Sequence, residues 1–235
     1  QAHVAGMAAG KAIRPTPMAV QESNSLFGKF NPSQPYQVVM DGACGFAWVT
    51  VRPANTRFAQ WLKRAKGCRL AYGGGIKTMF HVEQLLKAGA DKLIIGHAAV
   101  WPNLNFLREA TRTVGSQAIT VALDYIGGTH RLERGKLDTC VPVVISAKEL
   151  EEAGAGEILL TSIHREGTME GYDLETLHAV SQAVSIPVVA HGGCGSYEHM
   201  AEAIDAGAIA VAAGALFQFT ESTPKEAAEY LKAKG

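Results

Sequence analysis

This 235-residue sequence lacks a net charge, because its 22 Lys and Arg residues balance its 22 Asp and Glu residues. A neutral chain gives no electrostatic reason to expect a nucleic-acid partner or an anionic membrane surface. The sequence also lacks a run of about 18 apolar residues, which argues against a membrane-spanning helix. Its first residues, QAHVAGMAAGKA, do not join a basic stretch to an apolar run, so we expect no secretory signal.

Cysteine is scarce as well. The four cysteines, at positions 44, 68, 140 and 194, are scattered and form no CxxC pair. This usage is typical of a reducing compartment, so we expect a cytoplasmic protein without a disulfide framework. Apolar residues, by contrast, make up 47% of the chain. They are sufficient for the core of one large domain, and α/β barrels occupy about 200–250 residues as a single domain.

Two stretches of the chain repeat the same order of residue types. Residues 72–96 read YGGGIKTMFHVEQLLKAGADKLIIG, and residues 191–214 read HGGCGSYEHMAEAIDAGAIAVAAG. Each has paired glycines, a helix-like segment, Ala-Gly-Ala and an apolar run that ends at glycine. The shift between them is about 118 positions, half the chain. We interpret the pair as an internal duplication, and the alternative is two unrelated glycine-rich loops.

Short apolar runs alternate with helical patterns from about residue 68 onward. The runs have the length and composition of strands buried on both faces of a parallel sheet, and they cover 68–72, 92–96, 118–125, 157–163, 186–193 and 208–214. The helical patterns cover 78–88, 103–110, 146–153, 174–184, 197–206 and 224–233, the last after the helix-start sequence Thr223-Pro224-Lys225-Glu226. Such alternation predicts right-handed βαβ units. Since the duplication implies four units in each half, we predict a (β/α)8 TIM barrel.

Residues 1–67 do not follow this alternation. Residues 1–35 show no clear period, and residues 36–42 and 45–53 look like two strands joined by a turn at Asp41-Gly42, followed by a helix at 57–66. The first two barrel strands could lie here, with Val38–Asp41 as the best candidate, or the segment could be a replacement or a graft. We therefore divide the chain into an atypical N-terminal segment, 1–67, and barrel units three to eight, 68–235.

The repeated glycines predict anion sites. Glycine after a strand lets an anion approach the backbone, and the helix that follows supplies free N–H groups. One predicted phosphate site comprises Gly192, Gly193, Gly214 and Ala215, and its counterpart comprises Gly74, Gly75 and Gly96. Two such sites across a barrel mouth would suit an elongated substrate with a phosphate at each end. The alternative is that these glycines only turn corners.

Polar residues at the predicted strand ends are the candidates for chemistry, since barrels place it there. Asp124 closes an otherwise apolar strand and could act as a general acid or base, or could instead cap a helix. In the loop 164–173, Gly167 and Thr168 could donate hydrogen bonds to a substrate, unless that loop is simply solvated. His97, His164 and His191 follow three strand ends, but no HxH or HExxH spacing supports zinc, so we predict neither metal nor cofactor. We predict instead that His97 and His191 contact phosphate or substrate, and the alternative is that they are unremarkable polar positions.

The segments YGGGIKT, TVGSQAITVALD, GAGEILLTSI, REGTMEGYD, SIPVVAHGGCGSYEHMAEAI and AAGALF are similar to the cyclase subunit of imidazole glycerol phosphate synthase. The resemblance covers about residues 68–235 and is strongest to paralogues linked to acetamidino-sugar formation in surface polysaccharide synthesis. It implies a half-barrel duplication, a substrate with two phosphates, and ammonia delivered from a glutaminase partner on the N-terminal face. It also implies that Asp124 is catalytic, that Lys92 and Glu157 mark the ammonia entrance, and that the phosphate loops include Gly74, Gly75, Gly167, Gly193 and Gly214.

The sequence departs from that family at several positions. The family carries a second catalytic aspartate on its first strand, for which Asp41 is the only stand-in here. His97 replaces a small polar pair, His191 replaces a serine, and His164 and Glu166 replace aspartates of the sixth-strand loop. These departures favour the acetamidino branch over histidine biosynthesis. Two rivals remain, namely a phosphosugar isomerase or cyclase without a glutaminase, and a non-catalytic barrel used for assembly or binding.

Overall fold

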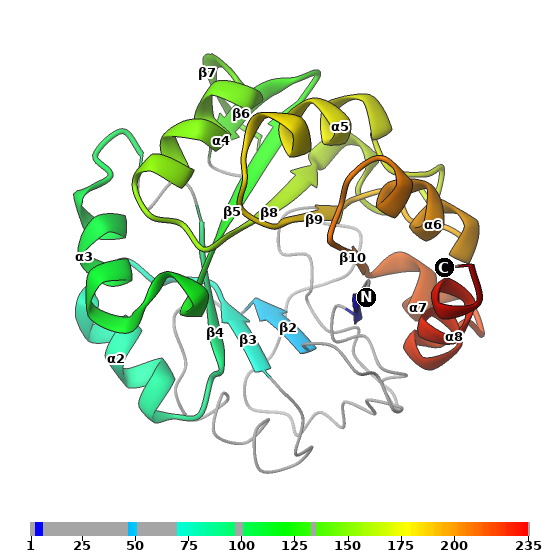
Figure 1. Cartoon of the computed structure of the whole chain (residues 1–235), viewed down its shortest axis with the longest axis horizontal. Coiled ribbons are helices and arrows are strands. Elements are labelled where there is room, and N and C mark those ends of the chain that lie inside the picture. The colour runs from blue at the N-terminus through cyan, green and yellow to red at the C-terminus, as the bar shows by residue number, and fades with distance from the viewer. Residues whose placement is uncertain (1–2, 7–46, 51–69, 97–100, 133–134, 235) are drawn as a thin grey trace.

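A computed structural model describes residues 3–6, 47–50, 70–96, 101–132 and 135–234 (Figure 1). In the described part of the chain, eight parallel strands form the main path of a ten-stranded sheet, in the order β1-β10-β9-β8-β5-β4-β3-β2. The two strands at the ends of this order, β1 and β2, approach within 8 Å between Cα atoms, so the sheet curls into a cylinder. The strands are β1 (His3–Gly6), β2 (Ala47–Thr50), β3 (Leu70–Gly73), β4 (Lys92–Gly96), β5 (Ile119–Ile126), β8 (Glu157–Ser162), β9 (Val188–His191) and β10 (Ala210–Ala213).

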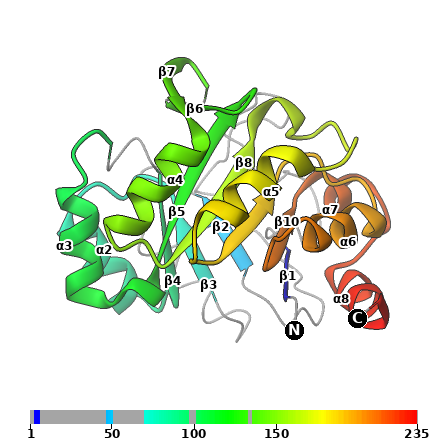
Figure 2. The same cartoon turned by 45° about the horizontal axis from the view of Figure 1, so that its top comes forward.

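The described helices lie outside this cylinder (Figures 1 and 2). Thr78, Asp173 and Ser196 each begin a helix by accepting a hydrogen bond from the backbone N–H three residues later. The predicted start of the last helix is confirmed, since Thr223 and Glu226 exchange side-chain-to-backbone hydrogen bonds. The helices are α2 (Met79–Lys87), α3 (Asn105–Val114), α4 (Val143–Glu152), α5 (Leu174–Ala183), α6 (Tyr197–Asp205), α7 (Ala215–Phe219) and α8 (Pro224–Lys234), with 3-10 turns η3 (Ser116–Ala118) and η4 (Ile163–Arg165).

The strands are buried between the helices and the lumen. On β5, Ile119, Val121 and Leu123 are fully buried on the outer face, in the same hydrophobic cluster as helix leucines such as Leu107 and Leu150. Each such side chain contributes about 1.5–3 kcal/mol to stability through burial. Alternate residues point the other way because strand side chains alternate between faces. Thr120, Ala122 and Asp124 therefore face the lumen. The fold predicted from the alternation, a (β/α)8 barrel, is confirmed.

The duplication is visible in the geometry of the two halves. Tyr72 pairs with Leu93 between β3 and β4, and Ala190 pairs with Val211 between β9 and β10, so both members of the register shift by 118 positions. Gly74 and Gly192, also 118 positions apart, have nearly the same positive φ, 100° and 95°. Both glycine turns follow the carboxyl ends of strands in one parallel sheet, and β3 and β9 lie four places apart in the strand order. The turns therefore share one rim of the barrel, on opposite sides.

The N-terminal segment differs in part from the prediction. Part of the stretch 45–53 does form a strand, but β2 pairs in parallel with β3, so it belongs to the barrel and not to a hairpin. The first place in the barrel is taken by β1, which pairs in parallel with β10 and was not recognised because HVAG is short and weakly patterned. The predicted strand Val38–Asp41 and the helix at 57–66 lie outside the described residues.

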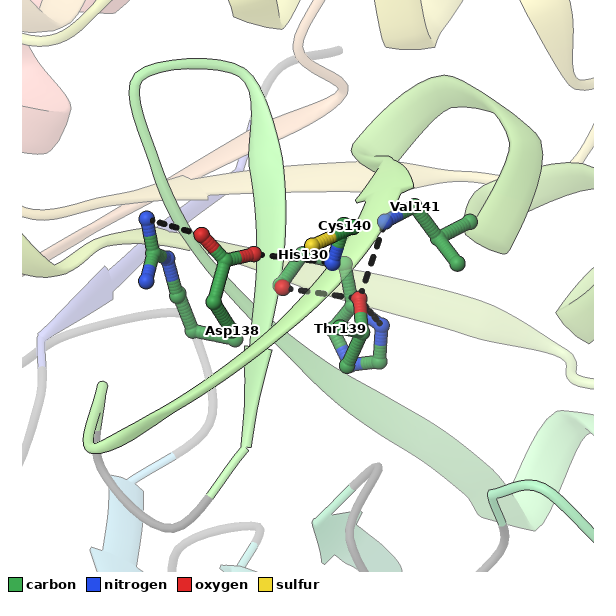
Figure 3. A network of polar contacts seen from close by, with 6 residues as sticks. His130, Asp138, Thr139, Cys140 and Val141 are labelled. Atoms are coloured by element: carbon green, nitrogen blue, oxygen red, sulfur yellow. Dashed lines mark hydrogen bonds and ion pairs between the residues drawn. The ribbon is translucent and has the colours of Figure 1, made fainter.

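A hairpin that the sequence did not predict follows β5. It consists of β6 (Thr129–Leu132) and β7 (Leu137–Pro142) and extends beyond the end of β5 (Figure 2). Its sequence, THRLERGKLDTCVP, lacks the apolar content of the barrel strands. Polar contacts hold it instead (Figure 3). Arg131 pairs with Asp138 at 2.8 Å, and the Thr139 hydroxyl donates to the His130 carbonyl at 2.9 Å.

Candidate functional site

A cleft opens at the carboxyl-end rim among the loops that follow β8, β9 and β10. Seven of its ten lining residues are glycine or alanine, so backbone forms most of its wall. The lining residues are Glu166, Gly167, His191, Gly192, Gly193, Cys194, Ala212, Ala213, Gly214 and Ala215. The cleft therefore brings together six residues that the sequence predicted as phosphate or substrate contacts, namely Gly167, His191, Gly192, Gly193, Gly214 and Ala215.

The loop after β8 is pinned to the rim. The Gly171 N–H donates a hydrogen bond to the Gly193 carbonyl at 2.7 Å, and the Arg165 guanidinium donates to the Gly171 carbonyl at 3.2 Å. The buried Tyr172 hydroxyl donates to the Ala212 carbonyl at 2.9 Å. Two of these contacts tie the loop to the rest of the rim and the Arg165 contact braces it internally, so the loop is a fixed wall of the cleft, which disfavours the alternative of a freely solvated loop. Thr168 is exposed, does not line the cleft, and donates its hydroxyl to the Arg165 carbonyl.

The glycines of the cleft are required for two different reasons. Gly167 and Gly193 both have positive φ, 80° and 104°, which other residues rarely adopt. A Cβ on Gly167 would meet no atom within 4 Å, so its backbone faces open space. A Cβ on Gly193 would collide with the Gly171 carbonyl oxygen, and one on Gly192 would lie 2.5 Å from the Ser162 carbonyl oxygen. A positive φ thus explains the glycine at position 167, whereas at positions 192 and 193 the close approach of another backbone segment also requires glycine.

Polar side chains form a row next to this cleft. The register pairs Asp124 of β5 with Thr161 of β8, and Thr161 with His191 of β9, so the three lie on the same face of the sheet at the same level. Thr161 Oγ1 lies 3.3 Å from His191 Nδ1. His191 and Glu166 are each only 7% exposed. Burial lowers the pKa of His191 below its ordinary value, and the negative charge of Glu166 opposes that effect.

A second polar cluster lies at the opposite end of the barrel. Lys92 and Glu157 are the first residues of β4 and β8, and Lys92 Nζ donates to Glu157 Oε2 at 2.6 Å with both side chains 14% exposed. The Thr120 hydroxyl donates to the other carboxylate oxygen of Glu157 at 2.7 Å. Thr120 and Asp124 are four residues apart on β5, so the two polar ends are separated by about 13 Å along the strand.

The other predicted residues are placed outside the cleft or outside the described part of the chain. Gly74 and Gly75 form the matching turn after β3, both with positive φ, and Gly96 ends β4 beside open space. They lie on the same rim across the barrel from the cleft. His97 and Asp41 fall outside the described residues, so their predicted roles stay predictions.

Four residues of the cleft were not predicted as contacts, namely Glu166, Cys194, Ala212 and Ala213, and of these Glu166 and Cys194 carry ionisable side chains. Burial raises the pKa of the Cys194 thiol to about 11, so it is neutral near pH 7. The only sequence feature that could have indicated Glu166 is its position in a glycine-rich loop. Among the described residues, no group of three or more His, Cys, Asp or Glu side chains is arranged to hold a metal ion. The described helices are all too short or too polar to cross a bilayer.

Comparisons with known proteins agree with this geometry. The sequence profile of the histidine biosynthesis protein family matches residues 47–223. Over 170 residues the chain is 44% identical to imidazole glycerol phosphate synthase subunit HisF of Endomicrobium trichonymphae, covering 70% of this chain and 65% of that protein. Over 176 residues it is 41% identical to the HisF subunit of Clostridium botulinum strain Okra, covering 71% and 68%. The match thus spans about two thirds of the length of these curated relatives.

Proposed function

Because the chain belongs to the histidine biosynthesis protein family, we propose that it is an ammonia-dependent synthase subunit of the imidazole glycerol phosphate synthase type. In this proposal it receives ammonia from a glutaminase partner and acts on a phosphate-bearing small molecule, as a lyase or cyclase of the cytoplasm. The observation that carries the proposal is the division of the barrel into two polar ends. An amide-lined cleft with Asp124 beside it lies at one end, and the Lys92–Glu157 pair lies at the other.

The cleft is suited to a phosphate group. Gly167, Gly193 and Gly214 line it without a side chain, and a phosphate accepts hydrogen bonds from backbone N–H groups at turns of this kind. The matching turn at Gly74 and Gly75 would hold a second phosphate across the rim, as expected for an elongated substrate. Held at both ends, the reacting part of the substrate would lie over the lumen, where Asp124 can exchange protons with it.

The opposite end is suited to ammonia entry. Lys92, Glu157 and Thr120 place a paired cation and carboxylate where the lumen meets the N-terminal face. Because the two charges neutralise each other, a small neutral molecule such as ammonia can pass without an isolated charge to bind it. A glutaminase docked on that face would deliver ammonia about 13 Å below Asp124 along β5.

One observation favours the acetamidino-sugar branch of the family. The described residues of β1, His3–Gly6, carry no carboxylate, and the first acidic residue in the whole sequence is Glu22. The first-strand aspartate of the histidine pathway therefore has no counterpart on this strand. A nucleotide-linked acetamido sugar is the corresponding candidate substrate, with its phosphates bound at the same glycine turns.

The experiment supplies purified protein with ammonium chloride, or with a glutaminase subunit and glutamine. One arm offers the two-phosphate substrate that yields imidazole glycerol phosphate, and the other offers a nucleotide-linked acetamido sugar. We expect turnover in one arm, and we expect Asp124→Asn to reduce it at least about 100-fold, as for loss of a general acid–base. Turnover in neither arm would contradict the proposal. A functional Asp124→Asn protein would favour a non-catalytic barrel.

A further inference from the structure

We propose that His191 is a second acid–base group of this site, acting together with Asp124 in place of the acid that β1 does not supply. The inference rests on the proposed function, since it assigns a proton-transfer role within that reaction. It concerns a residue at which this chain departs from the serine implied by the family resemblance.

The register places His191 within reach of the same ligand as Asp124. The two residues are separated only by Thr161, on adjacent parallel strands β5, β8 and β9. Neighbouring strands lie about 4.8 Å apart, so the backbones of Asp124 and His191, two strands apart, are about 10 Å from each other. Both side chains project toward the barrel axis. A reacting atom between them can be reached by both side chains, as a pair of proton-transfer residues requires.

The contacts of the imidazole orient it for this role. Thr161 Oγ1 contacts Nδ1 at 3.3 Å, so one ring nitrogen is held by the protein. His191 also lines the cleft, beside Gly192 and Gly193. With Nδ1 engaged, Nε2 is the nitrogen that can exchange a proton with a bound substrate. Thr161 is thus a positioning residue for His191.

The charged and titratable groups around His191 suit a proton acceptor. Glu166 from the loop after β8 is buried in the same cleft and favours the protonated imidazole, while burial favours the neutral one. Cys194 and Tyr172 are also buried there, and burial raises the pKa of both, so both are neutral. Asp124 contributes the remaining carboxylate from β5. Burial therefore favours the neutral imidazole at rest, and the carboxylate of Glu166 stabilises the charge that it gains.

The duplication shows that this histidine is specific to the second half. With the shift of 118 positions, the residue equivalent to His191 is Gly73, which has no side chain. The two positions also share the same register, since Gly73 pairs with Ile94 and His191 pairs with Ala212. The backbone of the repeat therefore does not require a histidine at this position.

The proton transfer can be written in full for addition of ammonia to a carbonyl carbon. The nitrogen lone pair forms the N–C bond, and the C=O π electron pair moves onto the oxygen. Nε2 of His191 takes one proton from the nitrogen and then returns it to that oxygen, which gives a hemiaminal with no net gain or loss of protons. Asp124 then carries out the later proton transfers, so each of the two groups has its own acid–base step.

The test uses the full chain with ammonium chloride and whichever of the two substrates above the wild-type protein converts. We expect His191→Asn to lower kcat about 100-fold or more while KM changes less than about 3-fold, because the reacting step and not binding is affected. Added imidazole should restore part of the activity of His191→Ala. The acid limb of the kcat/KM profile, below pH 6.5 in the wild type, should be absent from His191→Asn. His178→Gln, on the exposed face of α5, is the matched control and should behave as wild type.

The outcomes separate this inference from the proposed function. If Asp124→Asn loses activity but His191→Asn stays within about 3-fold of wild type, the inference is wrong and the proposed function stands. If the wild type converts neither substrate, both are wrong. An NMR titration adds a readout that needs no turnover, since Asp124→Asn should lower the pKa of His191 when the two charges share a site. An unchanged titration would contradict their coupling.

Discussion

A single methyl group on Gly193 tests whether backbone contact between two loops holds the cleft together. The Gly193 carbonyl accepts a 2.7 Å hydrogen bond from Gly171, and an added Cβ would collide with the Gly171 carbonyl oxygen. In Gly193→Ala we expect loss of that bond, which costs about 1 kcal/mol. Forcing alanine to a φ of 104° costs about 1–2 kcal/mol more. The sum, about 2–3 kcal/mol, should lower Tm by about 4–12 °C in a chain of this size.

Two other glycines provide matched controls for that experiment. Gly167→Ala imposes a similar φ, 80°, but meets no atom within 4 Å, so only the backbone term of about 1–2 kcal/mol applies. Gly96→Ala meets no atom within 4 Å and has no positive φ, so its stability should be close to wild type. Thermal unfolding followed by circular dichroism, with and without inorganic phosphate, measures all three. Equal losses in Gly167→Ala and Gly193→Ala would refute the interlocked loops, as would undiminished phosphate stabilisation of Gly193→Ala.

Two further predictions concern charged groups elsewhere in the barrel. Lys92→Met leaves the largely buried Glu157 without its cation, so the free energy of unfolding, measured in urea, should fall by about 1.5–3 kcal/mol. The Lys92→Met/Glu157→Gln double variant should recover part of that loss. Additive losses would contradict a coupled pair. Burial lowers the pKa of His130 from 6.5 to about 4, so the unfolded chain binds its proton first as the pH falls. Stability should therefore be lost between pH 6.5 and 4, by at most about 3 kcal/mol, and His130→Asn should flatten that dependence.

The predictions from sequence succeeded where one residue pattern has one structural outcome. Six apolar runs and six helical patterns from residue 68 onward correspond to strands and helices of the barrel. Lys92 and Glu157 open their strands as predicted, because strand boundaries follow directly from the runs. The short strand β1 was missed because four small residues carry too little periodicity, and its parallel partner β10 lies about 200 residues away. The β6–β7 hairpin was missed because polar contacts hold it in place of an apolar face.

The sequence by itself determined the alternation of strands and helices, the duplication and the residue types available at each strand end. Those properties can be read from short stretches of the chain, because they depend on the local periodicity of apolar residues and on where glycine occurs. Only the tertiary structure decided which strand ends meet. Asp124, Thr161 and His191 share one level because the registers of β5, β8 and β9 align them, and Glu166 enters the cleft because Gly171 and Tyr172 pin its loop. Such contacts join residues far apart in the chain, so no short stretch of sequence can specify them.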